Sequence, residues 1–175
     1  RGAHAGVAPE SGRNAATELA HQVLAIGGLG DRSKETTVNV TTLKAGTAIN
    51  VIPDAATAQG DMRAYVSEEF DRVERDLSGL AKTTHVPDTS VTTKLTRTFP
   101  PMPRNAGTDG LAAKAQAIYG EIGRKLTLES SGGAADSSFT AAAGTPTIDG
   151  PGLVGGGIHS ADEEAEGERV VPRLH

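Results

Sequence analysis

A glycine run that leads to one histidine and then to a cluster of acids is the segment of this chain with the clearest chemical potential. Residues 155–157 are glycines, His159 follows them after Ile158, and residues 162–164 are all acidic. Imidazole is the commonest neutral metal ligand, so the pattern suits a loop that presents His159 to a metal or a substrate. A catalytic zinc usually takes three protein ligands. The segment therefore predicts one ligand of a site whose other ligands lie elsewhere.

The composition limits both the fold and the function. The chain has 175 residues, enough for one ordinary domain or two small ones, and with only two Tyr and three Phe its core must be mainly aliphatic. A net charge of −5, with both signs interspersed, argues against binding to nucleic acid or to an anionic membrane. No apolar run is long enough to span a membrane. Cysteine is absent, which excludes disulfides and a thiol nucleophile but leaves the compartment, cytoplasmic or periplasmic, undecided.

Hydrophobic spacing predicts a first domain of alternating strands and helices over residues 1–98. The expected elements are helices over 14–26 and from Ser67, with Ser67 as N-cap, and strands over 36–43, 55–66 and 90–98. The helices have apolar faces at Ala15, Leu19, Val23 and Ile26, and at Phe70, Val73, Leu77 and Leu80. With one further strand ahead of Arg1, this is the β-α-β-β-α-β order of a split βαβ, ferredoxin-like domain.

Prolines at positions 100, 101 and 103 mark a boundary before residues 99–175 become a second region. The elements expected there are helices over 111–119 and 137–143 and strands over 125–129 and 145–149. Alternating helices and strands predict a mainly parallel α/β unit, but four elements are too few to close one. The chain also begins without Met, and both of its ends suggest cuts through a longer protein.

Four motifs, in order along the chain, resemble a known family. Gly2-Ala3-His4-Ala5-Gly6-Val7-Ala8-Pro9-Glu10 resembles "S-H-A-G-x-x-P-E", and Asn50-Val51-Ile52-Pro53 with Asp61 and Arg63 resembles "N-x-I-P … D-x-R". Gly132-Gly133-Ala134-Ala135-Asp136 and residues 155–160 resemble two late substrate and metal loops. Each motif alone is weak, but together they resemble the zinc-dependent aminoacylase/carboxypeptidase family, and within it the glutamate carboxypeptidases of the carboxypeptidase G type.

The resemblance implies an architecture and a set of partners. Residues 1–98 would be the small dimerisation (lid) domain lacking its first strand, and residues 99–175 an incomplete C-terminal segment of the catalytic domain. Family members are homodimers that hold two zinc ions in each protomer. Most of the zinc ligands and the general base belong to the half of the catalytic domain that this chain does not contain. We therefore expect the chain alone to be inactive.

The resemblance also implies roles for particular residues. His159 would bind zinc, and Glu164 would orient its ring. His4 would reach across the dimer and donate a hydrogen bond to the oxyanion of the tetrahedral intermediate. Arg63 would grip the free carboxylate of the substrate, with Asn50 beside it. The backbone amides of Gly132 and Gly133 would approach the substrate closely, because glycine has no Cβ.

Simpler interpretations of the same residues stay open. His159 and His4 would also serve as surface or loop-capping residues, and Arg63 would also pair with Asp61. Asn50 would stabilise a turn, Asp136 would cap the helix at Ser137, and Glu164 would belong to a solvated acidic run. Ala135 stands where the family usually has Ser or Thr, which removes a hydroxyl contact.

The function that these residues imply is hydrolysis of an amide whose amine side carries a free α-carboxylate. The expected reaction is release of C-terminal glutamate from N-acyl, peptide or folate substrates. Two alternatives stay open. One is a non-catalytic dimerisation module, and the other is a related deacylase of the acetylornithine or succinyl-diaminopimelate type.

Overall fold

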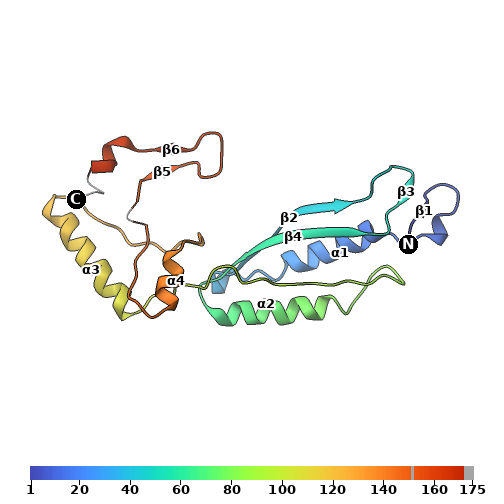
Figure 1. The fold of residues 1–175 in the computed structure, drawn as a ribbon, viewed down its shortest axis with the longest axis horizontal. Helices are drawn as coiled ribbons and strands as arrows, with labels where there is room; N and C mark the ends of the chain where they lie inside the picture. Colours follow the sequence, from blue (N-terminus) through green and yellow to red (C-terminus); the bar gives the residue numbers. More distant parts are fainter. Residues whose placement is uncertain (151, 172–175) are drawn as a thin grey trace. The chain divides into compact units, whose positions relative to one another are not determined.

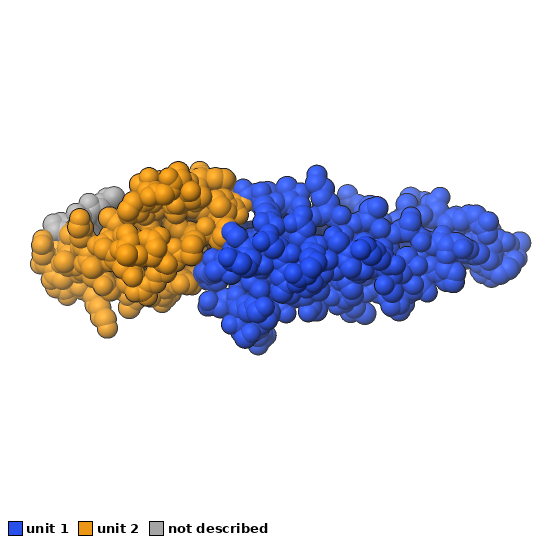
Figure 2. Space-filling view, turned by 90° about the horizontal axis from the view of Figure 1, so that it is seen from below, with its two compact units in different colours: residues 1–98 blue, residues 99–175 orange. Residues whose placement is uncertain are grey.

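The computed structural model describes residues 1–150 and 152–171. The chain divides into two compact units, Arg1–Thr98 and Phe99–His175, which Figure 2 shows in blue and orange. None of the helices within the described ranges combines the length and the apolar character needed to cross a membrane.

The first unit contains two helices and four strands (Figure 1). Its elements are β1 (Ala3–His4), α1 (Ala15–Gly27), β2 (Thr37–Ala45), β3 (Val51–Ile52), β4 (Ala56–Arg63) and α2 (Ser67–Leu80), with 3₁₀ turns at Pro9–Ser11 and Arg32–Lys34. β2 and β4 form an antiparallel pair in which Thr37 lies opposite Arg63, with one irregularity between Val40 and Thr42. β1 and β3 form a second, short antiparallel pair that the hydrophobic pattern did not predict. α1 packs against β2, β4 and α2.

The two helices of this unit begin in different ways. The side-chain oxygen of Asn14 accepts hydrogen bonds from the backbone N–H groups of Ala16 and Thr17, so it caps α1. α2 has Val66 at the N-cap and no side-chain cap, and the prediction that Ser67 is the N-cap is wrong. Ser67 already has helical geometry, and two acids follow it in the first turn, where they favour the positive end of the helix dipole.

A buried carboxylate of α1 holds the loop that follows α2. Glu18 is only 4% exposed, and its Oε2 accepts the backbone N–H groups of His85 and Val86, each at 2.7 Å. Gln22, equally buried, donates from Nε2 to Glu18 Oε1 at 2.8 Å and to the Thr83 carbonyl oxygen at 2.9 Å. Burial acts to raise the pKa of Glu18, but these hydrogen bonds outweigh it and leave the pKa lowered. Polar contacts thus lie on a helix face that was expected to be apolar.

A second buried carboxylate ties α2 to the start of β2. Glu69 is 5% exposed and accepts hydrogen bonds from Arg72 NH2 at 2.7 Å and from Thr36 Oγ1 at 2.9 Å, while Lys34 Nζ lies 3.1 Å from it. The hydrogen bond from Arg72, followed by those from Thr36 and Lys34, lowers the pKa of Glu69 to about 2. Beside this network, Val73 is the large side chain that is fully buried.

Residues 90–98 do not form the expected strand. This segment runs beside α2 (Figure 1), where Arg97 pairs with Asp71 at 2.6 Å and Glu74 at 2.8 Å. A strand exists only where a neighbouring strand satisfies its backbone groups. The predicted order needed a first strand ahead of Arg1, and no strand of the described residues pairs with 90–98.

The second unit contains α3 (Ala106–Glu121), α4 (Ser137–Ala142), β5 (Gly155–Gly156), β6 (Glu164–Ala165) and a 3₁₀ turn at Gly167–Arg169. Both predicted helices form, and α3 begins with a capping box between Asn105 and Thr108. The strands predicted over 125–129 and 145–149 are absent, and within residues 99–150 and 152–171 the one strand pair, β5–β6, is antiparallel. The mixed helix and strand class is confirmed, whereas the parallel pairing expected for this unit is not seen in these residues.

Candidate functional site

His4 lies on β1, and its ring is held by the turn that follows. Its Cα partner across the β1–β3 pair is Val51, so both side chains leave the same face of this short ribbon. The backbone N–H groups of Gly6 and Val7 each donate to His4 Nδ1 at 3.2 Å. The residue is exposed. The interpretation of His4 as a residue that only caps a loop is therefore partly met, since one ring nitrogen does so.

Asn50 lies next to His4 in space. It occupies a turn in which Val51 N donates to the Ala48 carbonyl oxygen at 3.3 Å, and its own carbonyl oxygen accepts from Ala5 N at 2.9 Å. The side chain of Asn50 is exposed and makes no hydrogen bond with the described residues. The turn-forming role is thus carried by the backbone, which leaves the amide group of Asn50 available.

Arg63 ends β4 and is paired with a neighbouring acid. Its Nε donates to Asp61 Oδ2 at 2.7 Å, and the side chains of Arg63 and Asp61 are 40% and 50% exposed. Hydrogen bonding to Asp61 raises the pKa of Arg63. The simpler interpretation, a pair with Asp61, is therefore realised. A guanidinium group has five N–H donors, however, and this bond uses only the one on Nε.

The three residues do not meet within one chain. β1 and β3 lie beyond the Ala56 end of β4, whereas Arg63 is at the opposite end (Figure 1). At ~3.3 Å per residue, β4 alone separates these ends by about 23 Å. The structure thus brings His4 and Asn50 together and leaves Arg63 remote from both.

In the second unit, the loop before α4 presents backbone rather than side-chain groups. Gly132 and Gly133 are exposed, and Gly133 N donates to Ser131 Oγ at 3.0 Å. Asp136 makes no side-chain cap at the start of α4, so that interpretation is wrong. Its φ of −62° and ψ of −23° are already helical, whereas a capping residue needs an extended backbone.

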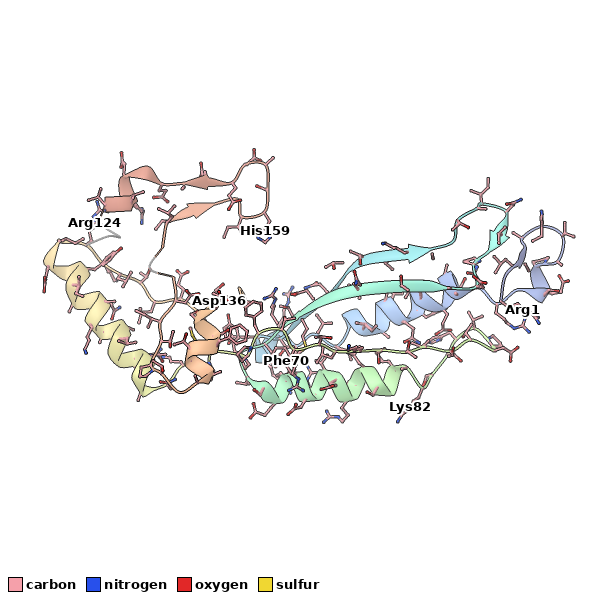
Figure 3. The ribbon with its side chains drawn as sticks, viewed as in Figure 1. Arg1, Phe70, Lys82, Arg124, Asp136 and His159 are labelled. Carbon is pink, nitrogen blue, oxygen red and sulfur yellow. The ribbon has the colours of Figure 1, made fainter. Side chains whose placement is uncertain are left out.

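The β5–β6 hairpin carries His159 at its tip, and Figure 3 shows the residue there. His159 has a φ of +64°, Gly157 has a φ of +67°, and Ser160 Oγ donates to the Gly157 carbonyl oxygen at 2.7 Å. Glu164 lies on β6 opposite Gly156 and is exposed. No hydrogen bond joins His159 to Glu164 in this structure, so the ring is oriented by the turn.

These residues do not build a metal site by themselves. Within residues 1–150 and 152–171, no three His, Asp or Glu side chains form a group that could hold a metal ion. His159 with Glu164 therefore fits part of a metal site, and the chain's described residues do not fit a complete one.

A cavity of about 610 Å³ lies elsewhere in the second unit. It is lined by the end of α3, by residues 124–127 and by the turn at Gly167–Arg169, with charges of both signs. None of the residues that the motifs single out lines it. The cavity therefore does not coincide with the candidate chemistry.

Comparison with known proteins identifies the first unit. The model of the peptidase dimerisation domain of the M20 peptidases matches residues 1–89, which is half of the chain. The chain belongs to this family. The M20 dimerisation domain thus includes β1 to α2 and three of the candidate residues, His4, Asn50 and Arg63. The family expected from the motifs is confirmed.

Similarity extends beyond the M20 dimerisation domain. The chain is 36% identical to carboxypeptidase G2 of Pseudomonas sp. over 174 residues, which is 99% of this chain and 42% of that protein. It is 38% identical to a p-aminobenzoyl-glutamate hydrolase homolog of Haemophilus influenzae over 84 residues, 43% of this chain and 20% of that one. The crystal structure of aminopeptidase PepT from Bacillus cereus superimposes with a TM-score of 0.75 and 27% identity, covering 99% of this chain and 46% of its own. The chain spans less than half the length of each.

Some features of the site were missed from the sequence. The hydrogen bonds from Gly6 and Val7 to His4, and the pairing of β1 with β3, were not predicted. The only signal was the motif itself, which places a glycine two residues after the histidine. A strand of two residues is too short for a period-2 pattern to reveal it.

Proposed function

We propose that this chain is part of a homodimeric di-zinc exopeptidase that releases C-terminal glutamate from N-acyl, peptide or folate substrates. The observation that carries the proposal is the placement of His4, Asn50 and Arg63 on an M20 dimerisation domain, in a chain that resembles carboxypeptidase G2 along nearly its whole length. Zinc would polarise the scissile carbonyl group. Because the described residues do not complete a zinc site, we assign its remaining ligands to the part of the protein outside this chain.

The geometry favours a site made by two protomers. In an N-acyl amino acid, the scissile carbonyl carbon and the carboxylate carbon lie within about 4–5 Å of each other. His4 and Asn50 are separated from Arg63 of the same chain by more than the length of β4. One substrate molecule therefore meets His4 and Asn50 from one protomer, and Arg63 from the other. This changes the expectation that Asn50 and Arg63 of one chain hold the carboxylate together.

Asp61 has a part in this arrangement. It holds Arg63 through Nε, at 2.7 Å, and thereby fixes the plane of the guanidinium group. The two terminal nitrogens then face away from that bond and present parallel N–H donors, the geometry that a carboxylate accepts. The pair with Asp61 and the grip on a substrate are compatible.

The proposed dimer uses the exposed edge of the β2–β4 sheet. β2 is nine residues long and pairs with β4 alone, which leaves its other edge open within the described residues. An open edge of this length is a template for strand pairing. A second copy of the chain, related by a twofold axis, would pair with β2 in antiparallel fashion.

A test of this function uses the intact protein with added zinc. We expect hydrolysis of an N-acyl-glutamate, and little or none of N-acetylornithine or N-succinyl-diaminopimelate, whose cleavage would favour the deacylase alternative. Arg63→Ala should lower kcat/KM on the glutamate substrate by about 10–100-fold, because charge-assisted hydrogen bonds are lost. Arg63→Lys should not restore it, since Lys lacks the planar fork. An unchanged kcat/KM in Arg63→Ala would contradict the assignment.

A second candidate function is a non-catalytic association module. It is favoured by the absence of a metal-binding group from residues 1–150 and 152–171 and by the match to a dimerisation domain. Light scattering combined with zinc titration of this chain distinguishes the two. A dimer that binds no zinc supports the module as the activity of the chain itself, whereas stoichiometric, tight zinc binding contradicts our assignment of the missing ligands.

A further inference from the structure

The two N–H groups that meet on His4 indicate which nitrogen of this ring carries the proton. Gly6 N and Val7 N each lie 3.2 Å from Nδ1. Both are backbone amides, and a backbone N–H group only donates. Nδ1 must therefore present its lone pair, because a proton there would point at two other donors.

We infer that Gly6 and Val7 are positioning residues that hold His4 in its Nε2–H tautomer, which makes the outer nitrogen a hydrogen-bond donor for an anionic oxygen. In a neutral imidazole, one nitrogen donates and the other accepts, and the hydrogen bond made by one decides the state of the other. His4 is exposed, and its Nε2 makes no hydrogen bond with residues 1–150 or 152–171. The donor therefore points to no partner within the described chain.

This assignment decides what His4 can do chemically. The only lone pair of the Nε2–H tautomer is at Nδ1, where Gly6 and Val7 occupy it. His4 therefore does not accept a proton in its held position, and it acts as a donor rather than as a general base. The identity of the acceptor as a carbonyl oxyanion rests on the proposed function, but the tautomer does not.

The chain offers a matched pair of substitutions at Gly6. A Cβ added there would lie 3.9 Å from His4 Cε1 and 4.0 Å from Nδ1, which is ordinary contact, and the φ of Gly6 is not in the left-handed region. Gly6→Ala thus keeps the N–H donor without crowding the ring. Gly6→Pro removes that donor, because proline has no backbone N–H. Val7 is a less specific handle, since its N–H also approaches the His4 carbonyl oxygen at 3.4 Å.

The experiment measures the ring nitrogens of His4 directly. The full chain is labelled with ¹⁵N and studied by long-range ¹H–¹⁵N correlation spectra at a pH of about 8.5, where an ordinary imidazole is neutral. His4→Gln identifies the His4 signals. We expect an unprotonated Nδ1 and a protonated Nε2 in the unmodified chain and in Gly6→Ala. In Gly6→Pro, signals of the Nδ1–H tautomer should appear.

A protonated Nδ1 in the unmodified chain, or a mixture of tautomers like that of free histidine, would overturn the inference. If Gly6→Pro does not fold, as judged from its backbone amide spectrum, the unmodified chain still decides the question. The outcome is separate from that of the proposed function. An intact protein with no hydrolase activity and an Nε2–H ring contradicts only the function, and an active protein with an Nδ1–H ring contradicts only the inference.

Discussion

At the scale of single residues, Glu18 is a charged side chain that stabilises a helix contact. Its carboxylate accepts the N–H groups of His85 and Val86 inside the first unit. Glu18→Ala leaves both groups buried without a partner, and each unpaired group costs about 1–3 kcal/mol. We expect urea denaturation to show an unfolding free energy lower by about 2–4 kcal/mol.

The control is Glu10→Ala, because Glu10 is an exposed acid in the same unit. It should change the unfolding free energy by no more than about 0.5 kcal/mol. Equal stabilities of the Glu18→Ala and Glu10→Ala variants would show that the buried carboxylate is not needed.

Glu69 makes the stability of the first unit depend on pH. Its pKa is about 2 in the folded chain, against 4.5 for an unperturbed carboxyl. The folded state therefore binds its proton less readily, so the stabilisation is fully present above about pH 4.5 and is lost as the pH falls toward 2. Thermal unfolding at a series of acidic pH values measures this loss.

Glu69→Gln is the matched variant, since it has no proton to take up. Its melting temperature should start lower at neutral pH and fall less than that of the unmodified chain below pH 4.5. Glu18 is present in both proteins, so its share of the acid effect cancels. Parallel curves for the two proteins would contradict the role of Glu69.

The sequence pointed to individual residues better than to their partners. Asn50 and Arg63 stood out by motif, yet the choice between their possible roles depended on which groups lie within hydrogen-bond distance. Asp136 shows why. Its residue type is favoured at a helix start, but its backbone is already helical, so the side chain does not reach the first amides. Such angles are set by the packing around a residue and not by its type.

At the scale of elements, the hairpin that carries His159 depends on a glycine. A Cβ at Gly155 would collide with the backbone carbonyl oxygen of Glu164 on the facing strand. We therefore expect Gly155→Ala to separate β5 from β6. Amide exchange measured by NMR should show loss of protection in both strands, and the turn at His159 should lose its ordered signals.

Gly152→Ala is the control for this prediction, because a Cβ at Gly152 would meet no atom within 4 Å. The hairpin should keep its exchange protection in this variant. Intact β5–β6 protection in Gly155→Ala would mean that the strands tolerate a shift that the close approach argues against.

The open edge of β2 gives a prediction about assembly. Thr41 is the residue that the irregularity between Val40 and Thr42 leaves without a partner on β4. Thr41→Pro removes an N–H group from β2 while sparing the register with β4. Light scattering should show a dimer for the unmodified chain and for Thr41→Ala, and a monomer for Thr41→Pro. A dimeric Thr41→Pro chain would place the interface elsewhere.

Helices were easier to predict than strands in this chain for a physical reason. A helix satisfies its backbone hydrogen bonds within its own segment, so local spacing and a capping residue such as Asn14 or Asn105 suffice. A strand depends on a neighbour that the local sequence does not specify. Thus 36–43 and 55–66, which pair with each other, were predicted correctly, whereas 90–98, 125–129 and 145–149 have no pairing strand in the described residues.

At the scale of the whole molecule, the motifs identified the family although several individual elements were wrong. Motifs report residues that a site requires, whereas element predictions report local propensity, and tertiary context overrides propensity. The chain covers 42% of carboxypeptidase G2 and 46% of the PepT chain. The assignment of residues 99–175 to a catalytic domain therefore remains a proposal, as does the zinc centre.

The separation of His4 and Asn50 from Arg63 along β4 has a genetic consequence. Two inactive variants should complement each other, because in a mixed dimer of His4→Ala with Arg63→Ala one site receives an intact His4 and an intact Arg63. Random exchange of protomers gives mixed dimers in about half of the population, each with one good site, and so about one quarter of the normal activity. Activity assays before and after mixing the two intact variant proteins measure this rescue. If each protomer held a complete site, mixing would restore nothing.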